Sequence, residues 1–279
     1  MSDERSATNG VRAAARAGAS PDTDADQARI KAWRSHAAIS DLVSGLSLAL
    51  GDKLRAVVLY GPAARGEKTS GDEELHLLVV LGDLELDTLT AAGPSLGRWV
   101  GRGRATPRLF TQATLRDAAD VFPIELAEIA ERNLVLHGQD PMTSMPALDG
   151  ENLRLQCERE LREKLMRLQE AYALSRGKDA ELARLIVGSY AAFSLIFRGC
   201  LRLHGEVPPD TGLGATEAFS RRAGIDPAPF VEADKLRRGE SVGSIRDLFA
   251  RYYAALDRAV DAVDRFVSRS PAPREEVST

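Results

Sequence analysis

The β-strand signal in this sequence ends before Gly150, and this change of pattern constrains the fold more than any other feature. Before Gly150, short apolar and β-branched runs alternate with amphipathic helical stretches, which favours layers of strands and helices. After it, apolar residues recur at the 3.6-residue spacing of long helices. The sequence therefore predicts an α+β chain, in which a mixed β-sheet domain is followed by an α-helical bundle.

The same patterns set the limits of the predicted domains. Residues 1–26 are rich in small and charged residues without periodicity, so we expect a disordered tail that buries too little apolar surface to offset its ordering entropy. The sheet domain is predicted over residues 27–145 and the helical bundle over residues 150–268, joined by a proline-bearing connector. A second disordered tail is expected at residues 269–279.

Individual elements follow from apolar spacing and from glycine and proline positions. In the first half we expect one amphipathic helix from Gln27 to Gly51, strands at 54–60, 75–81, 107–110 and 134–136, and helices at 84–100, 115–119 and 123–131. In the second half, long helices are expected around 161–172, 182–197 and 245–266. Pro208, Pro209, Gly212 and Gly214 are expected to break the chain between the last two.

Composition narrows the environment and the partners. The 37 basic and 41 acidic residues are interspersed and give a formal net charge of -4, which favours no nucleic-acid partner. The most apolar stretches fall short of the ~20 residues that span a bilayer, so no membrane partner is expected. Only Cys157 and Cys200 are present, which indicates two buried thiols in a reducing compartment. Residues 2–26 contain no apolar run of the kind a signal peptide carries, so a cytoplasmic location is expected by default.

One segment carries a pattern suited to phosphate chemistry. Residues 57–60, Val-Val-Leu-Tyr, end at Gly61, and residues 62–66 read Pro-Ala-Ala-Arg-Gly before a second apolar run at 75–81. This order resembles the signature of the nucleotidyltransferase superfamily, in which a strand ends in Gly-Ser, a helix carries Ala-Arg-Gly and a second strand begins Asp-x-Asp. Segments 122–126 and 135–141 are also similar to bacterial nucleotidyltransferase-like proteins that carry a C-terminal helical domain.

The resemblance implies a nucleotide site at this turn. In the family, the glycine and serine offer donors to a triphosphate, and two carboxylates on one face of the second strand hold Mg²⁺ for in-line displacement. The candidate nucleotide-binding residues that match the pattern are Gly61, Pro62, Arg65, Gly66 and Lys68. The candidate metal positions are Glu74 and His76.

The metal chemistry of the signature is altered in this chain. Pro62 stands where the serine belongs, and proline has neither a hydroxyl nor an amide hydrogen. Glu74 and His76 replace the two aspartates, and neutral imidazole is a poor ligand for Mg²⁺. The strand on which the family carries a third carboxylate, 105–110 here, has no acidic residue. The resemblance thus implies a nucleotidyltransferase fold with eroded metal-binding carboxylates.

Two other pairs of residues have the chemistry of catalytic groups. Glu125 and Glu128, three residues apart on an expected helix, could act as acid and base, although such carboxylates usually face water. Arg198 and His204 resemble the Arg-x(4 to 6)-His motif of HEPN-type helical domains, some of which are ribonucleases. Placement of both residues near a helix end is also what dipole complementation alone favours.

We therefore expect a pseudoenzyme: a nucleotide-binding or protein-binding module with weak or no transferase activity, whose protein partner would bind the helical bundle. One alternative is an active nucleotidyltransferase that uses Glu74 with Asp72 or Glu73 and requires a nucleoside triphosphate with Mg²⁺ or Mn²⁺. The other is a HEPN-like ribonuclease acting through Arg198 and His204 without metal.

Overall fold

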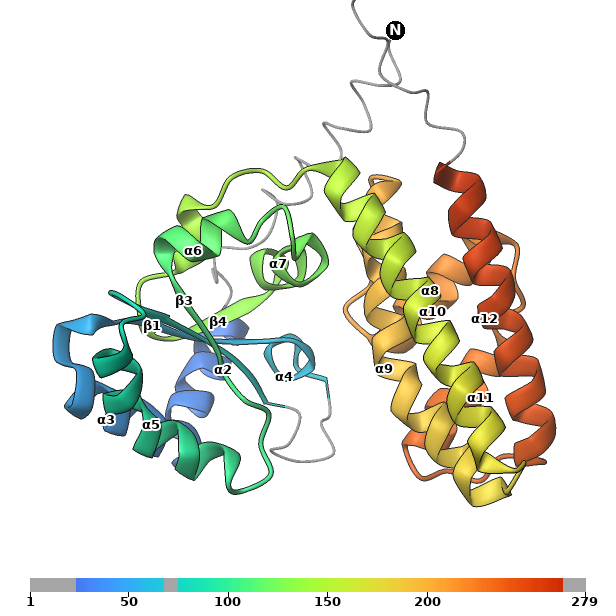
Figure 1. Ribbon diagram of the computed structural model, residues 1–279, viewed down its shortest axis with the longest axis horizontal. Coiled ribbons are helices and arrows are strands. Elements are labelled where there is room, and N and C mark those ends of the chain that lie inside the picture. The colour runs from blue at the N-terminus through green and yellow to red at the C-terminus, as the bar shows by residue number, and fades with distance from the viewer. Residues whose placement is uncertain (1–23, 68–74, 268–279) are drawn as a thin grey trace, which may run out of the picture. The chain divides into compact units, whose positions relative to one another are not determined.

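The computed structural model describes residues 24–67 and 75–267, with side chains described as far as Val263. Contacts within the chain divide it into two compact units, Met1–Asn152 and Leu153–Thr279. The first unit contains the sheet and the second unit is helical (Figure 1). An α+β chain with a helical second half is therefore confirmed.

Four strands form a mixed sheet in the order β3 (Arg108–Thr111), β2 (His76–Leu81), β1 (Leu54–Tyr60) and β4 (Asn133–Gly138). β1 runs antiparallel to β2 and to β4, whereas β2 and β3 are parallel. Nearly every residue of β1 and β2 is apolar and buried, because helices cover both faces of the sheet.

Helices cover both faces of the sheet (Figure 1), and each face has its own hydrophobic core. One core joins Val57 and Leu59 to α2 (Asp24–Arg34), α3 (Ala37–Leu50) and α5 (Leu86–Val100). The other joins Val58 and Leu78 to α6 (Gln112–Asp117) and α7 (Pro123–Glu131). A short helix, α4 (Pro62–Arg65), follows β1 directly.

The first helix was expected to run unbroken from Gln27 to Gly51, and this expectation is wrong. Two helices, α2 and α3, are separated at Ser35 and His36. The Ser35 hydroxyl donates to the carbonyl of Lys31, which competes with helix continuation. Arg34 also donates to the carbonyl oxygens of Leu136 and Val135 at 2.9 and 3.0 Å, which ties the end of α2 to the edge strand β4.

The limit of the expected N-terminal tail is also wrong by three residues, because α2 begins at Asp24. Asp26 is buried and forms ion pairs with Arg29 and Arg132, the latter at 3.6 Å. Two cationic partners offset the desolvation of this carboxylate. The start of α2 is therefore held by ion pairs, which a search for apolar periodicity does not detect.

Five helices form the second unit: α8 (Gly150–Ser175), α9 (Asp179–Leu203), α10 (Gly212–Ala223), α11 (Ala228–Arg237) and α12 (Ile245–Val267). Aromatic rings fill its core, where Phe197 stacks on Phe219 at 4.2 Å and meets the edge of Phe230 at 5.6 Å. The ring of Phe230 meets that of Tyr252 edge-on, which links α11 to α12. Cys157 and Cys200 are free and buried, as expected.

α9 is longer than the apolar stretch expected from the sequence. Its 25 residues are long and apolar enough to cross a membrane by length and composition. Phe193, Phe197 and Tyr190 on this helix are buried against the other helices of the unit. Part of the apolar surface of α9 is thus buried in the helical core, with 39% of its most apolar stretch buried.

The segment around Gly212 and Gly214 was expected to interrupt the chain, but helix α10 begins there, and α11 was not expected at all. Thr211 caps α10, since its hydroxyl accepts from the amide of Gly214 at 3.0 Å. A Cβ on Gly212 would lie 3.0 Å from the Ser194 hydroxyl of α9. The glycine at position 212 therefore permits close packing of two helices.

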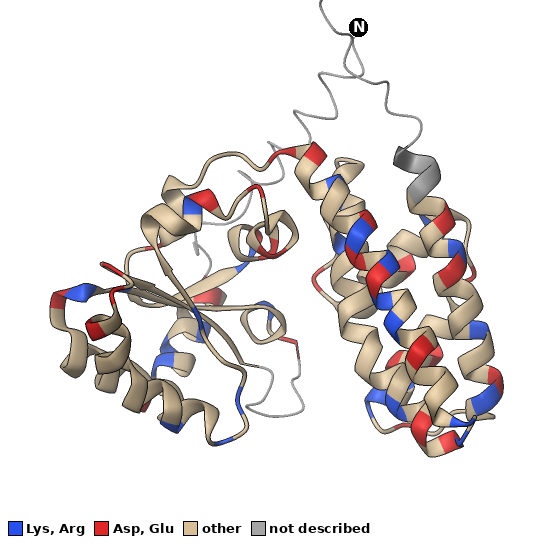
Figure 2. Ribbon diagram, in the orientation of Figure 1, with Lys and Arg blue, Asp and Glu red and all other residues tan. Residues whose placement is uncertain are grey.

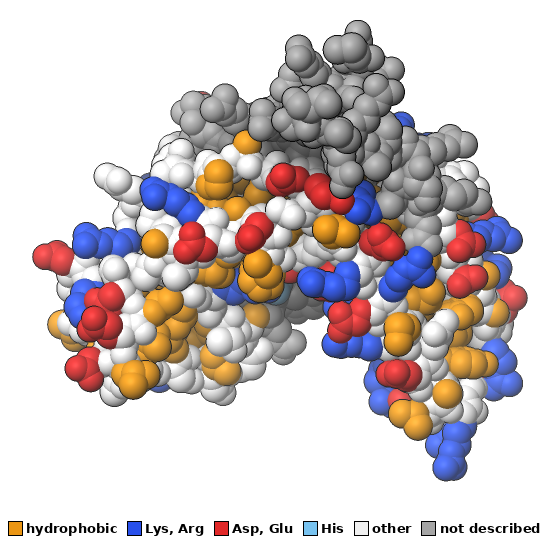
Figure 3. All heavy atoms as spheres, turned by 45° about the horizontal axis from the view of Figure 1, so that its top comes forward, with side chains coloured by type: hydrophobic (Ala, Val, Ile, Leu, Met, Phe, Trp, Pro, Cys, Tyr) orange, Lys and Arg blue, Asp and Glu red, His pale blue; other side chains and the backbone are white. Residues whose placement is uncertain are grey.

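Acidic and basic residues alternate along α8 (Figure 2). Several of them form pairs one turn apart, including Lys164 with Glu160 at 3.2 Å. On the face drawn in Figure 3, hydrophobic side chains lie between charged ones. The interspersed acidic and basic residues noted in the sequence thus lie as neighbouring pairs on helix surfaces.

Candidate functional site

The turn between β1 and α4 has the backbone geometry that the sequence pattern requires. Gly61 has φ 78°, a conformation open to glycine at little cost, and Pro62 occupies the first turn of the helix. Gly66 ends α4 with φ 80°. Because only glycine adopts these dihedral angles readily, Gly61 and Gly66 are fixed by the fold itself, whatever the turn binds.

His76 lies against this turn. It pairs with Tyr60 across the β1–β2 ladder, and the two rings are 5.7 Å apart. A Cβ on Gly61 would meet the His76 ring at 3.2 Å. The imidazole therefore borders the glycine turn, where the resemblance places a metal-binding carboxylate.

Arg108 joins Tyr60 and His76 from the neighbouring strand. β3 is parallel to β2 with Arg108 beside Leu78, so side-chain alternation puts Arg108 and His76 on the same face of the sheet. Burial raises the pKa of Tyr60, while the charge of Arg108 and its hydrogen bond to the tyrosine lower it, and Glu125 raises it. The strand at 105–110, on which the family carries a third carboxylate, thus carries the cation Arg108 at this site.

Arg65 is held by two carboxylates. Its Nη1 lies 2.6 Å from Oε2 of Glu128 and its Nε lies 3.0 Å from Oε1 of Glu67. The Arg65 and Glu128 side chains are only 6% and 5% exposed. The guanidinium therefore forms a buried link between α4 and α7, and the expectation that Glu128 faces water is wrong.

The remaining candidates at this site lie outside the described residues. These are Lys68, Asp72, Glu73 and Glu74. Within residues 24–67 and 75–267, no cluster of three or more His, Cys, Asp or Glu side chains is arranged to hold a metal ion. The described part of the site offers His76, Arg108 and Tyr60, with the carboxylate of Glu125 also acting on Tyr60. Arg108 gives this set a cation that can bind an anion.

The Arg198 and His204 pair does not have the geometry of an open nuclease site. Arg198 is 3% exposed and donates to the carbonyl oxygen of Pro209 within its own unit. His204 lies at the end of α9, with its Nδ1 3.1 Å from the guanidinium of Arg222. Burial lowers the pKa of His204, and the charge of Arg222 lowers it further while Glu206 raises it.

Sequence reasoning missed two residues of this site, Tyr60 and Arg108. A signal for each was present, because Tyr60 directly precedes the glycine turn and Arg108 begins an expected strand. The pairing of β3 with β2 was needed to bring them to one face, since parity along one strand says nothing about register with its neighbour.

Comparison with known proteins identifies the fold. No family model matches the sequence, and no curated protein matches it. The structure is similar to that of the spectinomycin adenyltransferase AAD(9) from Enterococcus faecialis, solved with ATP and spectinomycin, with a TM-score of 0.51 and 12% identity. The match covers 81% of this chain and 98% of that one, so it extends beyond the sheet unit into the helical unit. The chain therefore has a nucleotidyltransferase-like fold, with a mixed sheet followed by helices.

Proposed function

We propose that this protein binds a nucleotide at the β1–α4 turn through its phosphates, without a metal ion and with weak or no nucleotidyl transfer. The observation that carries the proposal is the position of Arg108, which shares a sheet face with His76 and contacts Tyr60 beside the glycine turn. The AAD(9) neighbour was solved with ATP, which supports a nucleotide as the ligand.

Electrostatics favours an anion over a metal at this face. The guanidinium of Arg108 repels a divalent cation, although water screens this repulsion because Arg108 is exposed. A phosphate gains charge-assisted hydrogen bonds from the same group. Arg65 supplies no comparable attraction, because Glu67 and Glu128 already neutralise it. Arg108 is thus the cation we assign to the phosphates.

The four histidines of the chain allow a direct test. In a proton–carbon NMR spectrum, ATP without metal is expected to move the His76 signal and to leave the His137 signal in place. Replacing Arg108 by Ala removes one charge-assisted hydrogen bond, worth about 1.5–3 kcal/mol, so the affinity should fall about 10- to 150-fold. Arg116→Ala, on the exposed surface of α6, is the matched control.

Two other results would replace this proposal. Binding that appears only with Mg²⁺ or Mn²⁺, together with pyrophosphate release, would indicate an active transferase using Glu74 with Asp72 or Glu73. If ATP, GTP, CTP and UTP all leave the His76 signal unchanged, the nucleotide site is excluded. The fold would then serve as a scaffold for a protein partner, which we would seek on the helical unit.

A further inference from the structure

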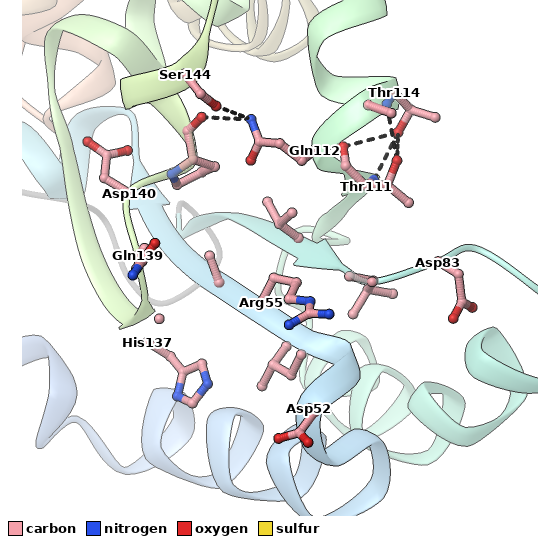
Figure 4. Close-up of a pocket in the computed structure, with 18 of the residues that line it drawn as sticks. Asp52, Arg55, Asp83, Thr111, Gln112, Thr114, His137, Gln139, Asp140 and Ser144 are labelled. Carbon is pink, nitrogen blue, oxygen red and sulfur yellow. Dashed lines mark hydrogen bonds between the residues drawn. The ribbon is translucent and has the colours of Figure 1, made fainter.

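A large hollow lies at the end of the sheet opposite Gly61. Its volume is about 1240 Å³, and it is lined by the start of β1 and by the ends of β2, β3 and β4. Figure 4 shows Arg55 near the middle, Gln139 and His137 close to each other at the left, and Asp52 below Arg55. Since Gly61 and His76 lie at the other ends of the same strands, this hollow is separate from the proposed nucleotide site.

Hydrogen bonds hold one rim of the hollow in place. Lys53 lies 3.0 Å from the carboxylate of Asp83 and donates to the hydroxyl of Thr88 at 2.9 Å. Thr88 in turn donates to Asp83 at 2.5 Å. These bonds and the charge of Lys53 lower the pKa of Asp83, with the Thr88 hydrogen bond as the largest cause. The polar side chains of this rim therefore pair with one another.

The opposite rim is held in a similar way. Gln112 of α6 donates from its amide nitrogen to the carbonyl oxygen of Pro141 at 3.0 Å and to the hydroxyl of Ser144 at 2.9 Å (Figure 4). Asp140 accepts from the amide of Met142 at 2.9 Å. The polar groups of both rims are thus used to fix the walls.

Close backbone contact fixes the floor. Gly138, at the end of β4, has φ 75°, and a Cβ there would lie 1.9 Å from the carbonyl oxygen of Arg55. No other residue fits this approach, so β1 and β4 meet with Arg55 and His137 on neighbouring strands. The two side chains are thereby presented to one space.

Four other polar side chains of the lining differ from those of the rims. Among the residues that the structure describes, Asp52, Arg55, His137 and Gln139 make no side-chain hydrogen bond or ion pair, although all four line the hollow. Arg55 offers a fork of donors that matches a phosphate or a carboxylate. Asp52 and the Gln139 amide can bind hydroxyl groups.

We propose that the hollow binds a small hydroxylated ligand that carries one phosphate or carboxylate group. The anionic group contacts Arg55 and His137, and the hydroxyl groups contact Asp52 and Gln139. A preformed concave site with a few converging polar groups is the usual form of a small-molecule site. This site is independent of nucleotide binding at the β1–α4 turn.

NMR titration of the full chain tests this site, with glucose 6-phosphate, gluconate, inorganic phosphate and glucose as probes. The His137 signal, assigned with a His137→Gln variant, is expected to move saturably with glucose 6-phosphate or with gluconate, which tells phosphate from carboxylate as the anionic group. Inorganic phosphate should bind more weakly than the better of these two, and glucose should not move the signal. A shift of the His76 signal without a shift of the His137 signal would place the probe at the β1–α4 turn and overturn the proposal.

Matched variants decide the role of Arg55. Arg55→Ala should weaken the binding of the best probe at least about tenfold, whereas Arg116→Ala and Arg108→Ala should leave it unchanged. Arg55 is exposed, so its variant should keep the thermal unfolding midpoint of the parent chain. The proposal is overturned if no probe moves the His137 signal, if glucose acts as strongly as glucose 6-phosphate, or if Arg55→Ala binds like the parent chain.

Discussion

Removal of the Glu128 carboxylate should strongly destabilise the sheet unit. The carboxylate lies 2.6 Å from Arg65, and both side chains are almost completely buried. Breaking a buried ion pair at one partner costs about 3–5 kcal/mol, because the other charge is left uncompensated. Glu67 remains 3.0 Å from Arg65 and offsets part of this cost, so Glu128→Ala should lower the free energy of unfolding by about 3 kcal/mol.

Tryptophan fluorescence during urea unfolding measures this change. Trp33 and Trp99 are the only tryptophans of the chain, and both belong to the sheet unit, so the signal reports its unfolding. The control is Asp41→Ala, which removes an exposed partner 4.0 Å from Arg102 and should change the free energy by less than about 0.5 kcal/mol.

A second variant separates the ion pair from simple loss of packing. In the double variant Arg65→Met, Glu128→Leu no buried charge is left on α7, while Glu67, whose side chain is 17% exposed, loses its partner, so part of the stability should return. A cost below about 1 kcal/mol for Glu128→Ala would refute the reasoning, since Arg65 would then be solvated and available to phosphate. A double variant less stable than Glu128→Ala would show that packing, and not charge, dominates.

Three further predictions concern other parts of the chain. Gly138→Ala should lower stability by at least about 3 kcal/mol, because the new Cβ meets the backbone of β1, whereas Gly103→Ala, with an equally left-handed backbone but open space, should cost only about 1 kcal/mol; thermal unfolding compares the two. Arg222→Ala should raise the pKa of His204 toward its ordinary value, which NMR can measure. Because the pKa of His204 is lowered in the folded chain, the stability carried by neutral His204 is present above pH about 6.5 and is lost as the pH falls through the folded pKa. The variant should narrow the pH range between the folded and unfolded pKa values over which this stability is lost. Phe219→Ala removes a fully buried ring stacked on a second phenylalanine and should cost about 3–5 kcal/mol in urea unfolding; a cost under 1 kcal/mol would contradict the described core.

Much of the sheet unit could be predicted because its strands are buried on both faces. The runs at 54–60 and 75–81 are almost wholly apolar. The Gly61-Pro62 pair predicts a turn that leads into a helix, because glycine adopts positive φ and proline suits the first helical turn. Helix α7 was expected over the residues it occupies, Pro123–Glu131, since proline begins it and apolar spacing continues it.

Other features depend on contacts between distant residues. Arg65 and Glu128 are 63 positions apart in the sequence. The sequence pattern of a helix does not distinguish a solvated arginine from one buried in an ion pair. The glycine at position 212 suited either a chain break or a close helix contact, and only its approach to Ser194 decides between them. The position of Arg108 required the register of β3 on β2.

The central claim is that this nucleotidyltransferase-like fold binds nucleotide phosphates through side chains and without a metal. Calorimetric titration with ATP, GTP, CTP and UTP, each with and without Mg²⁺ or Mn²⁺, tests it most directly. We predict binding of at least one nucleotide with an affinity that metal changes by less than about threefold, or less than 1 kcal/mol. Binding that requires metal and is lost when Glu74 and His76 are both replaced by Ala would contradict the account.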